Sequence, residues 1–208
     1  MTRSSSTWRI LASKGCGSAI AEAAFTIAGV PYERLELDYD SLASNPTLLE
    51  HNPLAQVPTA IAPDGLAVAE TAALVLIADE LAPGAGLLPP LGDPQRRDAL
   101  RWLVFFVAAI YPTFTYGDNP AKWGSGEPLR AATNAHREAL WRHLDGIARG
   151  PWFLGERFSA LDLYVGAMAN WRPGRVWFGE HAPKLDAIAR TVARDARLAE
   201  VWRVNGFA

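Results

Sequence analysis

The first eighty residues alternate between short apolar runs and one longer Ala-rich segment. The run Trp8 to Ala12 has the length and apolar content of a buried strand. A turn of small residues follows, and the segment Ser18 to Ala28 has the length of a helix that Gly29 would end as a C-cap. Beyond it, Leu35 and Leu37 alternate with polar residues, as in a strand. The pattern predicts a β-α-β unit.

A second group of strand signals precedes the next helix. The short run Thr59 to Ile61 is followed by the turn dipeptide Asp64-Gly65 and by another apolar run, Leu66 to Ala69. This order is typical of a β-hairpin. Apolar positions at helical spacing begin after Glu70 and Thr71, so a helix is expected to start there. The first part of the chain is therefore predicted to be a compact α/β domain.

Strand signals end where the sequence becomes rich in Pro and Gly. Residues 83–93 have a composition that neither strand nor helix tolerates, and we interpret them as a linker. They separate a predicted α/β domain, residues 1–82, from a predicted second domain, residues 94–208. A single boundary of this kind indicates two domains.

The second domain shows only helical patterns. A long helix is expected to begin at Pro94 and to be kinked by Pro112. Residues 128–148 predict a second helical hairpin, and Ser159 with Asp162 three residues later forms a capping-box variant ahead of an apolar run. Two more helices are expected, over residues 183–193 and 198–204. This domain is predicted to be all-α.

Composition narrows the classes of function. Twenty basic and 22 acidic side chains leave a net charge of -2, and no run of Lys or Arg is long enough to follow a phosphate backbone, so we expect no nucleic acid partner. The longest apolar run, Leu103 to Tyr111, is far shorter than the roughly 20 residues that span a bilayer. We therefore expect no membrane partner and a cytoplasmic protein. With one Cys and four widely spaced His, we assign no disulfide and no metal.

Four separated features resemble the glutathione S-transferase superfamily. They are the turn with Ser and Cys after the first strand, Gln56-Val57-Pro58, Glu70-Thr71, and Ser159-x-x-Asp162. Their order and spacing, and the linker between the halves, agree with that family over nearly the whole chain. The resemblance implies a thioredoxin-like N-terminal domain, an all-α C-terminal domain and a homodimer.

The resemblance also assigns residues to glutathione binding. In the family, a cis proline exposes the backbone of the preceding residue, here Val57 before Pro58, to the cysteinyl part of glutathione, which adds like an extra strand. Glu70 would face the ammonium of the γ-glutamyl end, and Thr71 at a helix N-terminus would bind its carboxylate. Thr71 stands where the family usually has Ser, which keeps the hydroxyl. Gln56 is a further candidate contact to the peptide.

The turn after the first strand carries the candidates for thiol activation. A free thiol with a pKa near ~8.5 is mostly protonated at neutral pH, so the enzyme must stabilise the anion. Ser13, Cys16 and Ser18 are the candidate catalytic residues, together with backbone N–H groups and the positive end of the following helix. Alignment to the family's Ser and Cys positions is ambiguous by a residue or two. The choice stays open, and Cys16 as a packed, unreactive thiol is the alternative.

In the family, the hydrophobic co-substrate lies between the first loop and the first long helix of the C-terminal half. We place this pocket at Lys14, Tyr111, Phe114, Tyr116 and Trp123. The first functional hypothesis is a transferase that activates glutathione, its co-substrate, for attack on a small hydrophobic electrophile. The alternatives are a thiol-transferase or lyase in which Cys16 forms a mixed disulfide, and a non-catalytic binding module with the same fold.

Overall fold

The computed structural model describes residues 7–207. Contacts within the chain divide it into two compact units, the described residues of 1–88 together with those of 192–208, and Pro89–Thr191. The domain bounds 1–82 and 94–208 stay a prediction. The contacts differ from that prediction at the C-terminus, because they group residues after Thr191 with the first unit.

The first unit contains a four-stranded sheet in the order β2-β1-β3-β4. β1 (Trp8–Ala12) runs parallel to β2 (Tyr32–Glu36) and antiparallel to β3 (Thr59–Ile61), which pairs antiparallel with β4 (Ala67–Ala69). A parallel pair joined by a helix, followed by a hairpin, is the arrangement that the sequence pattern predicts. The thioredoxin-like fold of this part is confirmed.

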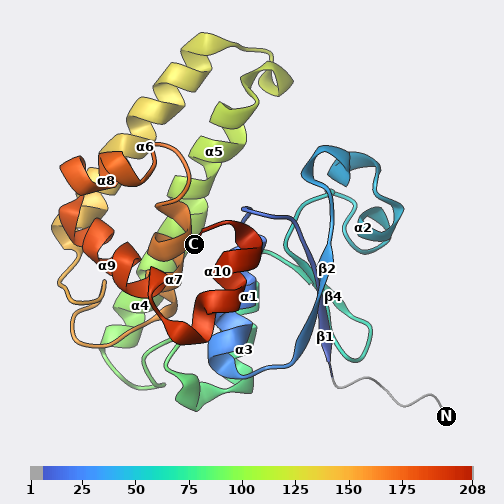
Figure 1. Cartoon of the computed structure of the whole chain (residues 1–208), viewed down its shortest axis with the longest axis horizontal. Coiled ribbons are helices and arrows are strands. Elements are labelled where there is room, and N and C mark those ends of the chain that lie inside the picture. The colour runs from blue at the N-terminus through green and yellow to red at the C-terminus, as the bar shows by residue number, and fades with distance from the viewer. Residues whose placement is uncertain (1–6, 208) are drawn as a thin grey trace. The chain divides into compact units, whose positions relative to one another are not determined.

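Helices lie on both faces of this sheet (Figure 1). On one face, α1 (Ser18–Ala28) packs against α3 (Thr71–Leu81) and against the C-terminal helix α10 (Ala199–Asn205). The opposite face carries α2 (Pro46–His51), which follows the 3-10 turn η1 (Tyr39–Ser44). Two further 3-10 turns are η2 (Pro83–Ala85) and η5 (Ala196–Leu198).

A small apolar core lies between the sheet and α2. Leu11 and Ile61 from the strands contact Leu42 and Leu48 from η1 and α2, and all four are buried. Val57 packs its side chain against this cluster. Burial of the cluster therefore fixes the loop that leads into β3.

The second unit begins with a helix that changes its hydrogen-bonding pattern midway. α4 (Gln95–Phe105) continues through the π-helical turn η3 (Phe106–Ile110) into α5 (Tyr111–Asp118). Because Pro112 lacks an N–H, an unbroken α-helical ladder is impossible there, and the π-helical turn lies directly before it. By length and composition alone, this segment, Gln95–Asp118, would pass for a membrane span, as core helices of bundles also do.

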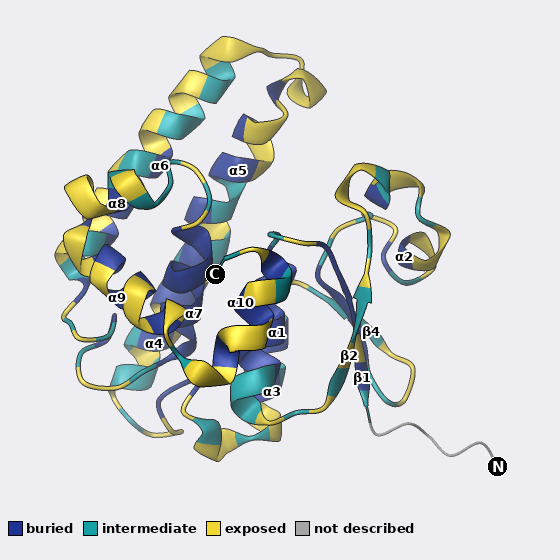
Figure 2. Ribbon diagram, viewed as in Figure 1, coloured by how far each residue is buried: buried dark blue, intermediate teal, exposed yellow. Residues whose placement is uncertain are grey.

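The remaining helices of the second unit surround α7 (Ala160–Met168), all nine residues of which are buried (Figure 2). The other elements are η4 (Pro120–Trp123), α6 (Glu127–Ile147), α8 (Arg175–His181) and α9 (Pro183–Ala193), whose last two residues belong to the first unit. The predicted capping box is present, since Asp162 Oδ2 accepts from the Ser159 N–H at 2.7 Å. Its other oxygen accepts from the Phe153 N–H at 2.8 Å. The all-α C-terminal half is confirmed.

Candidate functional site

The pairing of the strands brings the three N-terminal motifs to one end of the sheet. Thr59, the first residue of β3, pairs antiparallel with β1 on one side and with β4 on the other. When this register is continued by two residues, Val57 falls between Ser13, which follows β1, and Thr71, which follows β4. Neighbouring strands are about 4.8 Å apart. Three motifs that are distant in the sequence therefore lie within reach of one small ligand.

The loop before β3 offers an open backbone edge at Val57. Neither its N–H nor its C=O makes a hydrogen bond within residues 7–207, while its side chain packs into the core under α2. The peptide bond between Val57 and Pro58 is cis, as the resemblance implies. A fixed residue with a free donor and a free acceptor is the arrangement to which an extended peptide adds as a strand.

Asn52 supports this loop and was missed by the sequence analysis. Its side chain is 6% exposed, and its Nδ2 donates to the Gln56 carbonyl at 3.1 Å and to the Thr59 hydroxyl at 3.0 Å. The Gln56 carbonyl also accepts from the Thr59 hydroxyl, whereas the Gln56 side chain is exposed. The only signal in the sequence was the Asn52-Pro53 dipeptide, which predicts a turn but no partner.

Backbone strain is concentrated at this end of the sheet. Within residues 7–207, the non-glycine residues with positive φ are Ala55, at 54°, and Glu70, at 72°. Such conformations cost ~1–3 kcal/mol each and recur at ligand-binding sites. Ala55 lies two residues before Val57, and Glu70 is the residue that precedes α3.

The N-terminus of α3 is prepared for an anion. No side chain caps it and no acidic residue occupies its first turn, so the N–H groups of Thr71 and the next two residues have no intrahelical acceptor. Thr71 is 7% exposed and Glu70 is exposed. The arrangement sets a carboxylate beside free N–H groups, which suits a ligand that carries both an ammonium and a carboxylate.

Two of the three catalytic candidates bind each other across the turn after β1. The Ser18 hydroxyl accepts from the Ser13 N–H at 3.2 Å and donates to the Ser13 carbonyl at 3.1 Å. Both serines are buried, at 2% exposure for Ser13 and 0% for Ser18. Ser18 is therefore engaged in closing the turn.

Cys16 lies half-buried in the same turn, two residues before α1. Burial raises the pKa of its thiol, and this effect exceeds the lowering by a hydrogen bond with Ser13 and by the charge of Arg34. Burial therefore acts against a thiolate at Cys16 itself. The backbone N–H groups of Gly17 and Ser18, in contrast, make no hydrogen bond among the described residues.

Four of the five predicted hydrophobic-substrate residues form two groups in the second unit. Tyr111 and Phe114 both contact Trp171 edge-on, with ring centroids 5.8 and 5.2 Å apart, and Phe114 is 9% exposed. Tyr116 and Trp123 are 42% and 45% exposed and pack edge-to-face at 4.8 Å. The fifth predicted residue, Lys14, is exposed in the turn after β1 of the first unit.

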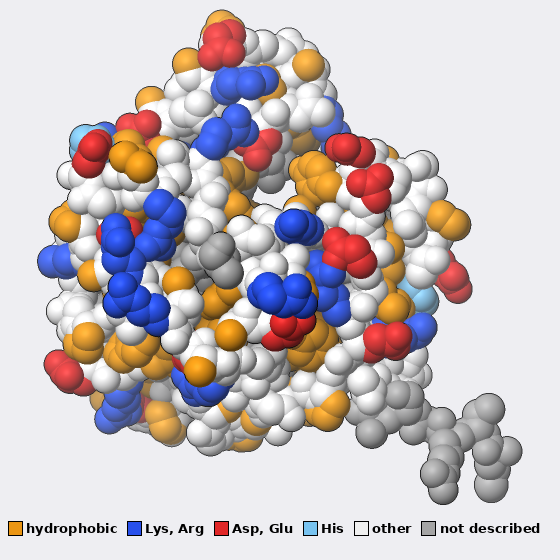
Figure 3. Space-filling model, viewed as in Figure 1, with side chains coloured by type: hydrophobic (Ala, Val, Ile, Leu, Met, Phe, Trp, Pro, Cys, Tyr) orange, Lys and Arg blue, Asp and Glu red, His pale blue; other side chains and the backbone are white. Residues whose placement is uncertain are grey.

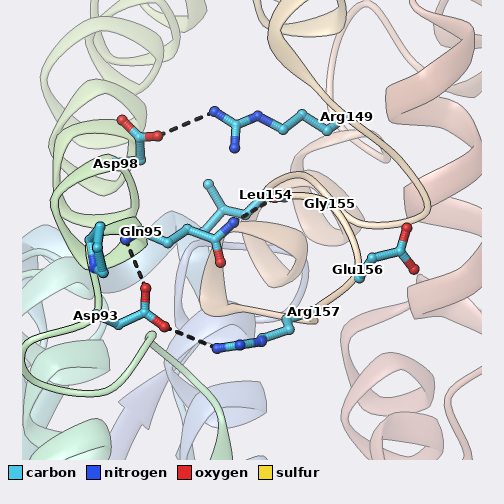
Figure 4. Close-up of a pocket in the computed structure, with 9 residues that line it drawn as sticks. Asp93, Gln95, Asp98, Arg149, Leu154, Gly155, Glu156 and Arg157 are labelled. Carbon is cyan, nitrogen blue, oxygen red and sulfur yellow. Dashed lines mark hydrogen bonds and ion pairs between the residues drawn. The ribbon is translucent and has the colours of Figure 1, made fainter.

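Other polar features of the second unit have internal partners. A surface hollow beside the start of α4 is crossed by ion pairs from Asp98 to Arg149 and from Asp93 to Arg157 (Figure 4). None of the predicted site residues lines it. Lys and Arg side chains also gather over α8 and α9 (Figure 3), where Asp186 pairs with two arginines. Within residues 7–207, no group of three His, Cys, Asp or Glu residues could hold a metal ion.

Comparisons with known proteins agree on one family. The chain is 35% identical to an uncharacterised GST-like protein, YncG, of Escherichia coli K12, over 92% of this chain and 95% of that protein. It is 31% identical to glutathione transferase GST 23 of Zea mays, over 73% of this chain and 66% of that protein. Its fold matches a solved glutathione transferase homologue from Sulfitobacter with bound glutathione, with a TM-score of 0.86 at 23% identity, over 98% of this chain and 100% of that one. No protein-family model matches the chain. The chain belongs to the glutathione S-transferase superfamily.

Proposed function

We propose that this protein binds glutathione at the end of the sheet where β1, β3 and β4 meet, and transfers it to a small hydrophobic electrophile. The observation that carries the proposal is the strand register, which sets Val57 between Ser13 and Thr71. The solved Sulfitobacter homologue contains bound glutathione, which supports this choice of ligand.

Each part of glutathione has a matching group at this site. The free N–H and C=O of Val57 bind the cysteinyl residue in the manner of an added strand, with Gln56 beside it. The γ-glutamyl carboxylate binds the free N–H groups and hydroxyl of Thr71 at the start of α3, and its ammonium faces Glu70.

The turn after β1 then activates the thiol. Glutathione's sulfur loses its proton to solvent, and the thiolate accepts a hydrogen bond from the Gly17 N–H at the positive end of α1. Ser13 and the Ser18 hydroxyl maintain the shape of this turn. The thiolate attacks the electrophile, a C–S bond forms, and the leaving group departs with the electron pair of its own bond.

Cys16 is assigned no covalent step. Its pKa is raised, so it stays a thiol at neutral pH and is a poor nucleophile for disulfide exchange. The hydrophobic electrophile is proposed to contact Lys14, Tyr111, Phe114, Tyr116 and Trp123. The protein is proposed to be a cytoplasmic homodimer.

Calorimetry with reduced glutathione, followed by a conjugation assay with a chloronitrobenzene, tests the proposed function. Saturable binding together with conjugation is expected for the wild type. Binding without conjugation to any of a panel of aromatic electrophiles would favour the non-catalytic module. No binding of glutathione would contradict the proposal as a whole.

A further inference from the structure

Two consecutive backbone amides in the turn after β1 are bound by side chains from distant elements. The Lys14 N–H donates to Glu36 of β2 at 3.1 Å, and the Gly15 N–H donates to Oδ1 of Asn205 at 3.2 Å. Gly15 has a left-handed φ of 74°, so its peptide plane has an orientation that other residues rarely adopt. Asn205 is the last residue of α10 and lies 190 positions further along the chain.

The side-chain amide of Asn205 fits in one orientation only. Its Nδ2 donates to the Val201 carbonyl at 2.9 Å and to Glu22 Oε1 at 3.4 Å, and both of these groups are acceptors. The oxygen must therefore face the Gly15 N–H, which is a donor. Asn205 is 2% exposed, so water does not compete for these bonds.

Glu22 connects Asn205 to the sheet. It is 1% exposed, and its second oxygen accepts from Arg34 Nε at 2.9 Å. Burial raises the pKa of Glu22, while Arg34, Asn205 and Ser18 act in the opposite direction. Arg34 also pairs with Glu36, the residue that binds the Lys14 N–H.

These contacts close a ring of hydrogen bonds behind the turn. Its members, in order, are Lys14, Glu36, Arg34, Glu22, Asn205 and Gly15. The ring joins β2, α1 and α10 to the turn and occupies the amides of Lys14 and Gly15. The amides left free further along the turn are those of Gly17 and Ser18. Ser18 is fully buried, so the Gly17 N–H is the proposed donor to the thiolate.

We propose that Asn205 is a positioning residue for thiol activation: through the ring that it completes with Glu22, α10 holds the turn so that the Gly17 N–H faces the sulfur of glutathione. This inference rests on the proposed function. Donors that are fixed before the reaction stabilise a developing anion better than donors that must reorganise. The C-terminal helix thereby contributes to catalysis without contacting the substrate.

The test compares Asn205→Ala with Arg203→Ala, which alters an exposed residue of the same helix that forms an ion pair with Glu200. Bound glutathione is titrated by the ultraviolet absorbance of its thiolate. Asn205→Ala is expected to move the titration midpoint up by about one pH unit, and conjugation at neutral pH should fall about tenfold. Arg203→Ala should match the wild type. A lower melting temperature in Asn205→Ala with an unchanged midpoint would reduce Asn205 to a structural role and overturn the proposal.

A second pair of variants addresses the ring itself and guards against misfolding of Asn205→Ala. Asn205→Asp keeps an acceptor for the Gly15 N–H but sets a carboxylate against Glu22, whereas Asn205→Asp with Glu22→Gln restores a donor between the two positions. The double variant is expected to titrate closer to the wild type than Asn205→Asp does. Equal midpoints in the two would contradict the ring.

Alkylation of Cys16, the only thiol of the chain, separates this inference from the proposed function. If the wild type fails to bind glutathione, the proposed function is wrong, and alkylation of the free protein still reports on the turn. The Cys16 rate is expected to rise several-fold in Asn205→Ala, because a loosened turn exposes the thiol. A rate equal to that of Arg203→Ala would show that Asn205 does not position the turn.

Discussion

Glu70 is the residue at which binding and stability are expected to respond in opposite directions. Its side chain is exposed and makes no capping bond, so Glu70→Ala should leave the free energy of unfolding nearly unchanged. Loss of its hydrogen bond to the ammonium of glutathione should cost ~1.5–3 kcal/mol, which corresponds to an increase in Kd of about 10- to 150-fold. Glu70→Gly should lose the same affinity.

Glu70→Gly should also stabilise the protein. Glu70 has a φ of 72°, which glycine adopts without a steric penalty, and relief of that strain should exceed the entropic cost of glycine by about 1 kcal/mol. In a chain of this length, the melting temperature should rise by about 2–4 °C.

Calorimetry with reduced glutathione and thermal unfolding of the free protein measure the two effects separately. Glu80→Ala, at the exposed far end of the same helix, is the matched control and should change neither quantity. An unchanged Kd in Glu70→Ala would remove Glu70 from the site. A lower melting temperature in Glu70→Gly would refute the assignment of strain.

Three further predictions concern other residues. Asn52→Ala should lower the free energy of unfolding in urea by ~2–3 kcal/mol and weaken glutathione binding, because the Gln56 carbonyl and the buried Thr59 hydroxyl lose a donor. Wild-type affinity would show that the loop does not need Asn52. Cys16→Ala should retain most conjugating activity, and the wild type should show no glutathione adduct by mass spectrometry after exposure to oxidised glutathione. An adduct on the wild type that Cys16→Ala loses together with activity would assign the chemistry to Cys16. Burial raises the pKa of Asp162 to about 6 from 3.8, so the folded state binds this proton more tightly than the unfolded state. The stability that this group contributes is therefore present below about pH 4 and is lost as the pH rises to about 6. The loss amounts to at most about 3 kcal/mol. Urea titrations across that range should show this slope in the wild type and a flatter one in Asp162→Asn.

The sequence predicted those elements whose signals are local. The strand at Trp8–Ala12, the helix at Ser18–Ala28 and the capping box at Ser159 each depend on residues a few positions apart, and each is present in the structure. The long helix of the second unit was predicted with a kink. Its π-helical form was not, because the sequence shows that Pro112 removes a donor but not how the backbone adapts.

The parts that the sequence could not predict depend on contacts between distant residues. Nothing near the C-terminus indicated that Asn205 binds the Gly15 amide, and the domain prediction placed residues 192–208 with the helical half. The sequence left the choice among Ser13, Cys16 and Ser18 open, because the degree of burial that raises the pKa of the Cys16 thiol follows from tertiary packing. The motif dipeptides were found individually, and the strand register was needed to bring them together.

Backbone amide chemical shifts of the protein, titrated with reduced glutathione, test whether glutathione binds at the end of the sheet where β1, β3 and β4 meet. Saturable changes are expected to be largest at Val57, Thr71 and Gly17, since these N–H groups are the proposed donors to the ligand. Amides of the hollow beside α4 serve as an internal reference and should not move. Saturable shifts elsewhere, with Val57 and Thr71 unaffected, or no saturable shift at all, would contradict binding at this end of the sheet.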